Sequence, residues 1–195
     1  MLLPGTPHEK LRVNLEGRME NDQFAIEAVV FLNSLYPDAS VRTIAARWDN
    51  DKTKPGWSFG ITSEKSAHKP NNLIMQLSGS DFQGSAAYEV AASGLHIPIG
   101  KPYYVAASID NHPAPGQNFG GTVTFYARDL SDPSATMQTV TVTHQIVGGY
   151  INKERALFVG GREIDNRSLW DGAIARVALR AGVLDAGKLM TWTVN

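Results

Sequence analysis

The segment TVTFYARD, from Thr122 to Asp129, decides the fold class. Its apolar side chains fall at every second position, from Val123 to Ala127, so an extended backbone would place them on one face and the polar side chains on the other. The segment TVTVTHQIV, residues 139–147, repeats this alternation and carries His144 on its apolar face. The polar stretch SDPSATMQ lies between the two segments. The pattern predicts an antiparallel hairpin whose strands each have one buried face.

Further short apolar runs lie on both sides of this hairpin, and clusters of Gly, Pro, Asn and Asp such as NDKTKPG and NHPAPGQNFGG separate them. These residue types favour turns because they supply positive φ, a fixed φ or local side-chain hydrogen bonds. Two of the runs are apolar on nearly both faces, which is typical of central strands that a second layer covers. The predicted strands, beyond the hairpin, are Leu11–Leu15, Phe24–Leu32, Arg42–Arg47, Trp57–Thr62, Leu73–Ser78, Tyr88–Ala92, Tyr103–Ile109, Ala156–Val159 and Trp170–Leu179.

The order of these runs predicts an all-β protein. No helical pattern long enough for a crossover separates the strands, which disfavours a parallel α/β sheet and favours a sandwich or barrel. Only Asp185–Thr191 is expected to form a short helix, with Asp185 as its N-cap. We expect one domain over residues 1–195, with the first ten residues loose. The expected core consists of Phe24, Ile26, Val30, Ile44, Phe59, Leu77, Val105, Phe125, Val142, Phe158, Ile174 and Val177.

Composition excludes several functions. The 195 residues include 18 basic and 19 acidic side chains, so the net charge gives no general attraction to nucleic acid. The absence of cysteine excludes disulfides, zinc–cysteine sites, iron–sulfur clusters and cysteine nucleophiles. No apolar run reaches the roughly 18 to 20 residues of a membrane span. The opening MLLPGTPHEK lacks the basic-then-apolar order of a signal peptide.

Three segments, in order along the chain, resemble the laminin-G-like domains of the concanavalin A-like lectin and glucanase superfamily. FAIEAVVFL resembles the F-x-[IL]-E-A-W-V strand, with Val29 where Trp is usual. PYYVAASID followed by GTVTFYARDL resembles the W-x-H-V-A hairpin, with Tyr103 and Tyr104 in the Trp and His region. ALFVGGREIDNRSLWDGAIARVALRAGVLDAGKL resembles the closing glycine-rich segment, including Gly160, Gly161 and Gly172.

The resemblance covers about residues 24–190. It implies an antiparallel two-sheet β-sandwich of the jelly-roll, concanavalin A-like type, in which the connecting loops carry any binding. It also implies an extracellular or cell-envelope location, as a module of a larger protein, and carbohydrate or protein as the ligand.

Catalytic signatures are incomplete. Glucanases of this superfamily use a Glu-x-Asp-x-Glu strand because a retaining hydrolase needs two carboxyl groups roughly 5 Å apart. Glu163-Ile164-Asp165 lacks the second glutamate, so no catalytic residue is predicted. The G-x-S-x-G stretch GWSFG, around Ser58, continues an alternating strand rather than the strand–turn–helix of a nucleophile elbow.

The five histidines show no ligand spacing, and His144 is expected to be a hydrogen-bonded core or interface residue rather than a metal ligand. Oxygen donors in two loops, Asp49 with Asp51 and Asp165 with Asn166, match what Ca²⁺ prefers, so calcium is a possible cofactor. The same residue types also stabilise turns, which is the simpler explanation of their position.

Aromatic rings flanked by amide, carboxylate and guanidinium groups are suited to sugar binding. Such side chains in the predicted loops are the candidate ligand-binding residues, although Trp48 and Trp57 also fit an alternating strand face. We therefore predict a non-catalytic recognition module for glycan or protein. The alternatives are a glycoside hydrolase or polysaccharide lyase of the superfamily, and a structural spacer or assembly domain. The candidate ligand-binding residues are Trp48, Asp49, Asn50, Trp57, Tyr150, Arg162 and Asp165.

Overall fold

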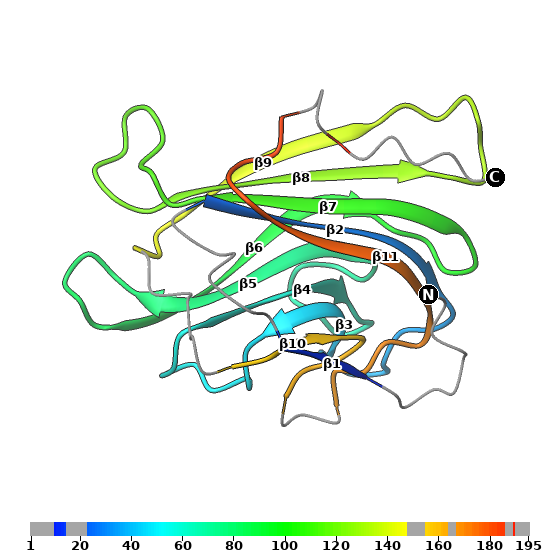
Figure 1. The fold of residues 1–195 in the computed structure, drawn as a ribbon, viewed down its shortest axis with the longest axis horizontal. Coiled ribbons are helices and arrows are strands. Elements are labelled where there is room, and N and C mark those ends of the chain that lie inside the picture. The colour runs from blue at the N-terminus through cyan, green and yellow to red at the C-terminus, as the bar shows by residue number, and fades with distance from the viewer. Residues whose placement is uncertain (1–9, 15–22, 148–154, 164–166, 186–188, 190–195) are drawn as a thin grey trace.

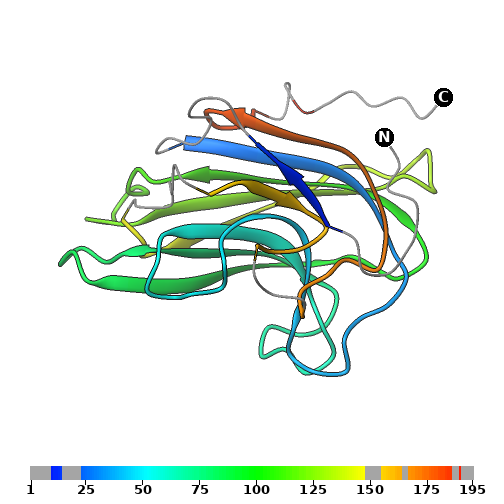
Figure 2. The same ribbon diagram turned by 60° about the horizontal axis from the view of Figure 1, so that its bottom comes forward.

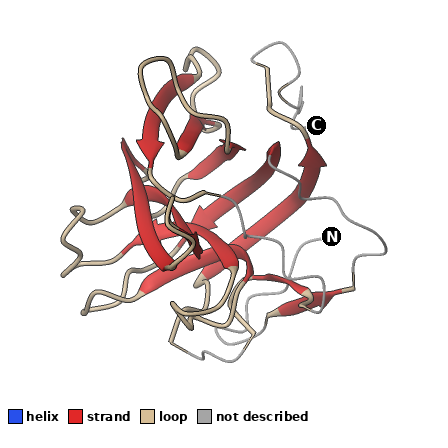
Figure 3. Cartoon of the chain, turned by 90° about the vertical axis from the view of Figure 1, so that its left-hand side faces the viewer, coloured by secondary structure: helices blue, strands red, loops and turns tan. Residues whose placement is uncertain are grey.

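A computed structural model describes residues 10–14, 23–147, 155–163, 167–185 and 189. The described chain forms eleven strands in two antiparallel sheets that pack face to face (Figures 1 and 2). Figure 3 shows only strands and loops among these residues. The predicted fold class, an all-β jelly-roll sandwich, is therefore confirmed.

The first sheet has six strands, in the order β1-β10-β3-β4-β5-β6. Every neighbouring pair is antiparallel, and bulges interrupt the β3–β4 and β5–β6 pairs. The six strands are β1 (Leu11–Val13), β3 (Val41–Arg47), β4 (Gly56–Thr62), β5 (Asn72–Ser80), β6 (Ala86–His96) and β10 (Leu157–Val159).

The second sheet has five strands, in the order β11-β2-β7-β8-β9. Its neighbouring strands are also antiparallel, and β8 and β9 form the hairpin that the sequence predicts. The five strands are β2 (Gln23–Leu32), β7 (Pro102–Asp110), β8 (Gly121–Asp129), β9 (Gln138–His144) and β11 (Gly172–Ala181).

The main core lies between the two sheets. Alternate residues of each strand point into it, as the period of two predicts, and Trp57, Phe59 and Phe125 are among its largest fully buried side chains. Phe158 is buried, as predicted, but the β10 residues in the main cluster between the sheets are its neighbours Leu157 and Val159. Because faces alternate along a strand, Phe158 lies on the outer face, where Lys10 Nζ is 5.5 Å from its ring centroid.

The outer face of the five-stranded sheet is covered by the segment that follows β11. Leu184 packs there with Tyr104 and Tyr126, its backbone N–H donates to Ser108 Oγ (2.8 Å), and its carbonyl accepts from Tyr126 Oη (3.1 Å). This second layer explains why β2 and β7 are apolar on both faces. Glu27 is buried as well, and its carboxylate accepts from Tyr104 Oη (2.7 Å) and pairs with Arg180.

The expected helix over Asp185–Thr191 falls largely outside the described residues. Asp185 and Leu189, which are described, are not helical. The described part of the chain contains no helix that is long and apolar enough to cross a membrane.

Candidate functional site

Small side chains of β4 create space on the outer face of the six-stranded sheet. Trp57 and Phe59 point into the core, so Gly56, Ser58 and Gly60 point outward. A Cβ on Gly56 would lie 2.6 Å from Trp48 Cδ1, so only glycine leaves room for that indole. β4 continues through Ser58 without a turn, so the G-x-S-x-G stretch does not form a nucleophile elbow, as predicted.

Trp48 occupies this space directly after β3. Its ring is buried and stacks on Tyr88 of β6, with 5.5 Å between ring centroids and 21° between planes. Its indole Nε1–H donates to the Asp51 carbonyl (2.9 Å), which fixes the ring to the loop that follows. Asn50 in this loop has φ +72°, a left-handed conformation that asparagine tolerates better than most residues.

Arg162, in the loop after β10, ties this region together. Its side chain is only 2% exposed, and its guanidinium lies 5.2 Å from the Trp48 ring centroid. It donates to Asn50 Oδ1, to Gln76 Oε1 and to Thr43 Oγ1. Because a guanidinium presents several donors in a fixed plane, one side chain holds a loop and two strands in register.

We call Trp48, Asn50, Gln76, Tyr88 and Arg162 the Arg162 cluster. Gln76 Nε2 donates to Tyr88 Oη (2.7 Å), so the hydrogen-bond network extends from Arg162 to the phenol. Tyr88 is half-buried and Asn50 is exposed, so the network reaches the surface.

Two further groups adjoin the cluster. Lys52 Nζ lies 4.3 Å from the Tyr88 ring centroid. The buried Ser58 hydroxyl, next to Gln76 in the sheet, has no hydrogen-bond partner within the described residues.

Charged side chains beside the cluster neutralise one another. Arg155 pairs with Asp49 and, at 2.9 Å, with Glu163. Lys54 lies 3.0 Å from Asp51. Hydrogen bonds from the side chain and backbone of Thr53 hold the pKa of Asp51 far below its usual value, and Lys54 adds to this effect. All three carboxylates therefore already contact cations.

The structure brings together four of the candidate residues, Trp48, Asp49, Asn50 and Arg162. Trp57 lies elsewhere: it is fully buried in the core, 5.4 Å from the Phe24 ring centroid, and offers no ring face to a ligand. Tyr150 and Asp165 lie outside the described residues.

Sequence reasoning did not select Gln76 and Tyr88. Each occupies an ordinary position in an alternating strand, and only the pairing of β4, β5 and β6 brings them to Trp48. No local motif marks that pairing.

The predicted calcium ligands are described only in part. Asp49 and Asp51 adjoin each other, with Asp49 Oδ1 accepting from the Asp51 backbone N–H (3.1 Å), but their carboxylates contact Arg155 and Lys54. Asp165 and Asn166 lie outside the described residues. No group of three or more His, Asp or Glu side chains that suits a metal ion occurs in the described ranges. The calcium site stays a prediction.

No family model and no curated protein matches this sequence. Solved structures are similar in fold. The CBM40 of the Ruminococcus gnavus IT-sialidase, bound to α2,3 sialyllactose, has a TM-score of 0.53 at 11% identity, over 95% of this chain and 94% of that one. The SAP-like pentraxin of Limulus polyphemus has a TM-score of 0.51 at 12% identity, over 93% and 73%.

The LG1-3 region of the laminin α2 chain has a TM-score of 0.51 at 14% identity, over 90% of this chain and 30% of that chain. At these identities the likeness concerns the fold alone. The chain has a laminin-G-like, concanavalin A-like jelly-roll fold, as its sequence resemblance implies.

Proposed function

We propose that this protein is a non-catalytic glycan-recognition module and that the Arg162 cluster forms its binding site. The observation that carries the proposal is the network from Arg162 through Gln76 to Tyr88, which orders polar groups beside a half-exposed aromatic ring. A pyranose has apolar C–H faces and equatorial hydroxyl groups, so a ring with adjacent fixed donors and acceptors suits it. Because Arg162 already fixes these side chains, little conformational entropy is lost when a ligand binds.

The comparisons make glycan the first ligand class to test. The Ruminococcus gnavus module is described as bound to α2,3 sialyllactose, and it shares this fold. Lys52, beside Tyr88, adds a cation at the solvent side of the cluster, which would favour a sugar that carries a carboxylate. Sialyllactose and neutral lactose therefore form an informative pair of probes.

The pairing of carboxylates supports binding rather than glycoside hydrolysis. A retaining glycosidase needs one carboxylate free as a nucleophile and a second carboxyl group as the acid. Glu163 and Asp49 both pair with Arg155, so neither is a free carboxylate beside a second carboxyl group. A polysaccharide that the protein shortens or unsaturates would favour the enzymatic alternative.

Calorimetric titration of the intact protein with sialyllactose and lactose tests this proposal, in the presence of Ca²⁺ and again with a chelator. We expect saturable binding of the acidic sugar, at least tenfold weaker binding by Tyr88→Ala, and a smaller loss for Tyr88→Phe, which keeps the ring. Lys52→Ala is expected to weaken only the acidic ligand. Lys65→Ala, which removes an exposed lysine from the β4–β5 connection, is the charge-matched control.

Absence of binding to either probe and to a broad glycan array would refute the glycan proposal. Equal affinities of Tyr88→Ala and the wild type for a bound sugar would refute the proposed location. A loss of binding with the chelator would support the predicted calcium site.

We further propose that the module works outside the cytoplasm, on a cell envelope or in the extracellular space, which fractionation of the source cells would test.

A further inference from the structure

The five-stranded sheet ends at β9, which pairs with β8 on one side and with no described strand on the other. An unpaired strand presents a row of free backbone donors and acceptors, and proteins usually protect such an edge with charges, prolines or bulges. β9 has none of these: its sequence is QTVTVTH, and its pairing with β8 is regular. No Asp, Glu, Lys or Arg occurs between Asp132 and Lys153.

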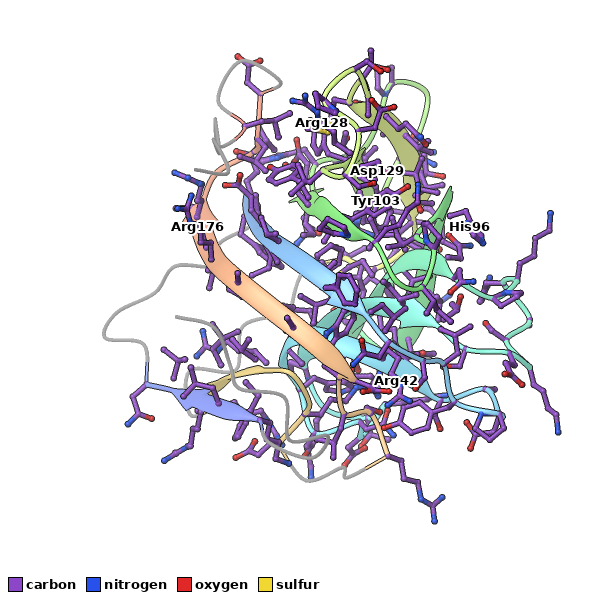
Figure 4. All side chains as sticks on the ribbon, turned by 90° about the vertical axis from the view of Figure 1, so that its right-hand side faces the viewer. Arg42, His96, Tyr103, Arg128, Asp129 and Arg176 are labelled. Carbon is purple, nitrogen blue, oxygen red and sulfur yellow. The ribbon has the colours of Figure 1, made fainter. Side chains whose placement is uncertain are left out.

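The other sheet edges are interrupted. At the opposite edge of the same sheet, β11 has a bulge at Arg176, whose φ is +54°, and Figure 4 shows this arginine on the outer side of the strand. In the six-stranded sheet, β1 has only three residues, and β6 has a bulge near Gly94, whose φ is +76°. β9 itself is thus a regular edge strand without charges, and the nearest charge is Glu89 of β6, whose carboxylate accepts from the Gln145 backbone N–H just beyond the end of β9.

We propose that β9 pairs antiparallel with β9 of a second copy of this chain, with a two-fold axis at Thr141, which joins two five-stranded sheets into one continuous sheet. The strand is self-complementary about this residue. Val140 of each copy lies opposite Val142 of the other on the inner face, and Thr139 lies opposite Thr143 on the outer face. No like charges meet across the axis.

Two further observations favour a second copy as the occupant. Val140 and Val142 pack against the core but are only partly buried, so the same residues of another copy would cover them. Exposed apolar side chains also lie beyond the end of β9. Val147 is 39% exposed, and its backbone hydrogen-bonds to Ser80. Phe82, two residues after Ser80 in the chain, is 60% exposed.

Phe82 also stacks on Phe119, with ring centroids 4.6 Å apart. These aromatic residues come from the β5–β6 and β7–β8 turns, which lie at one end of the sandwich (Figure 1). In the proposed dimer, Ala135–Met137 of the second copy would approach these aromatic residues, and this segment is uncharged.

Cysteine cross-linking tests the axis directly, because the chain contains no native cysteine. In an antiparallel pair, opposed Cα atoms lie about 4.5 to 5.5 Å apart, which a disulfide can bridge. Thr141→Cys is expected to form a covalent dimer rapidly under mild air oxidation. Thr124→Cys is the matched control: it is the neighbour of Thr141 on β8, so its two copies would be about 14 Å apart and should stay monomeric.

Sedimentation of the unmodified chain provides the second test. We expect a concentration-dependent dimer in the micromolar range. Thr141→Lys should weaken it at least tenfold because two lysines would face each other at the axis. Ala67→Lys makes an equal charge change in the exposed β4–β5 connection and should leave the dimer affinity unchanged. Circular dichroism and thermal melting check that the variants fold. A wild-type chain that stays monomeric at about 100 μM, or equal cross-linking of the two cysteine variants, would refute the proposal.

Discussion

Acidification should destabilise this protein through one buried histidine. His144 is the last residue of β9, and its side chain is fully buried, as its place on the apolar face predicts. Burial lowers the pKa of His144 from 6.5 to about 4, although hydrogen bonds to the backbone of Ile146 and the charge of Asp110 act in the opposite direction. The folded protein therefore keeps this imidazole neutral at pH values where an unfolded chain would protonate it.

The sign and size of the effect follow from proton linkage. Between pH 6.5 and about 4 the unfolded chain binds more protons than the folded chain, so the free energy of unfolding falls as the pH falls, and this contribution levels off below pH 4. The two pKa values differ by about 2.5, which corresponds to a loss of about 3 kcal/mol. Several aspartates also have lowered pKa values, so their contributions are present above pH 3.8, are lost mainly below it, and overlap with this range only at its acid end.

Urea denaturation at a series of pH values from 4 to 7.5 measures this loss. The wild type should lose about 3 kcal/mol of unfolding free energy across the range. His144→Gln should be less stable at neutral pH but should lack this slope, so the two curves should converge near pH 4. His68→Gln removes an exposed histidine and should follow the wild type. If His144→Gln keeps the wild-type slope, the histidine is not the group responsible and the reasoning from its burial is wrong.

Three substitutions test the packing and hydrogen bonding on the two outer faces. Gly56→Ala should lower the unfolding free energy by about 1 to 3 kcal/mol because the added methyl group collides with Trp48, and an unchanged urea midpoint would contradict this packing. Trp48→Ala should cost about 3 to 5 kcal/mol by leaving a cavity, again read from urea unfolding; a loss below 1 kcal/mol would mean that the indole is not a packed element. Tyr104→Phe removes a 2.7 Å hydrogen bond to the buried Glu27 carboxylate and should cost about 1.5 to 3 kcal/mol in thermal unfolding, whereas a stabilised variant would refute a net contribution from this bond.

The strands could be predicted from sequence because each one has its own local signal. The alternation from Val123 to Ala127 indicates a strand with one buried face, whatever its neighbours in the sheet are. The turn residues on either side indicate where the strand begins and ends. The burial of Phe158 could be predicted but its face could not, because a three-residue strand gives too short a pattern to show which side chains lie between the sheets. Its neighbours Leu157 and Val159 are also apolar, so hydrophobicity alone does not choose between the faces.

The candidate site was only partly predictable for a different reason. Trp48, Asn50 and Arg162 are of residue types that bind ligands and lie at strand ends, so composition and position indicated them. Their connection through Gln76 depends on which strands pair, and strand pairing between distant segments leaves no local pattern. The same pairing places Trp57 in the core, one residue away from the outward-facing Ser58.

The two broad faces of the sandwich differ in what covers them. Leu184 and its neighbours cover the outer face of the five-stranded sheet, whereas the Arg162 cluster lies on the outer face of the six-stranded sheet. A two-fold axis through β9 would run perpendicular to the sheets and would keep both clusters pointing in the same direction. Such a dimer would be bivalent: on a densely glycosylated surface, the second contact would form at a high effective concentration, and weak affinity at each cluster would become strong avidity.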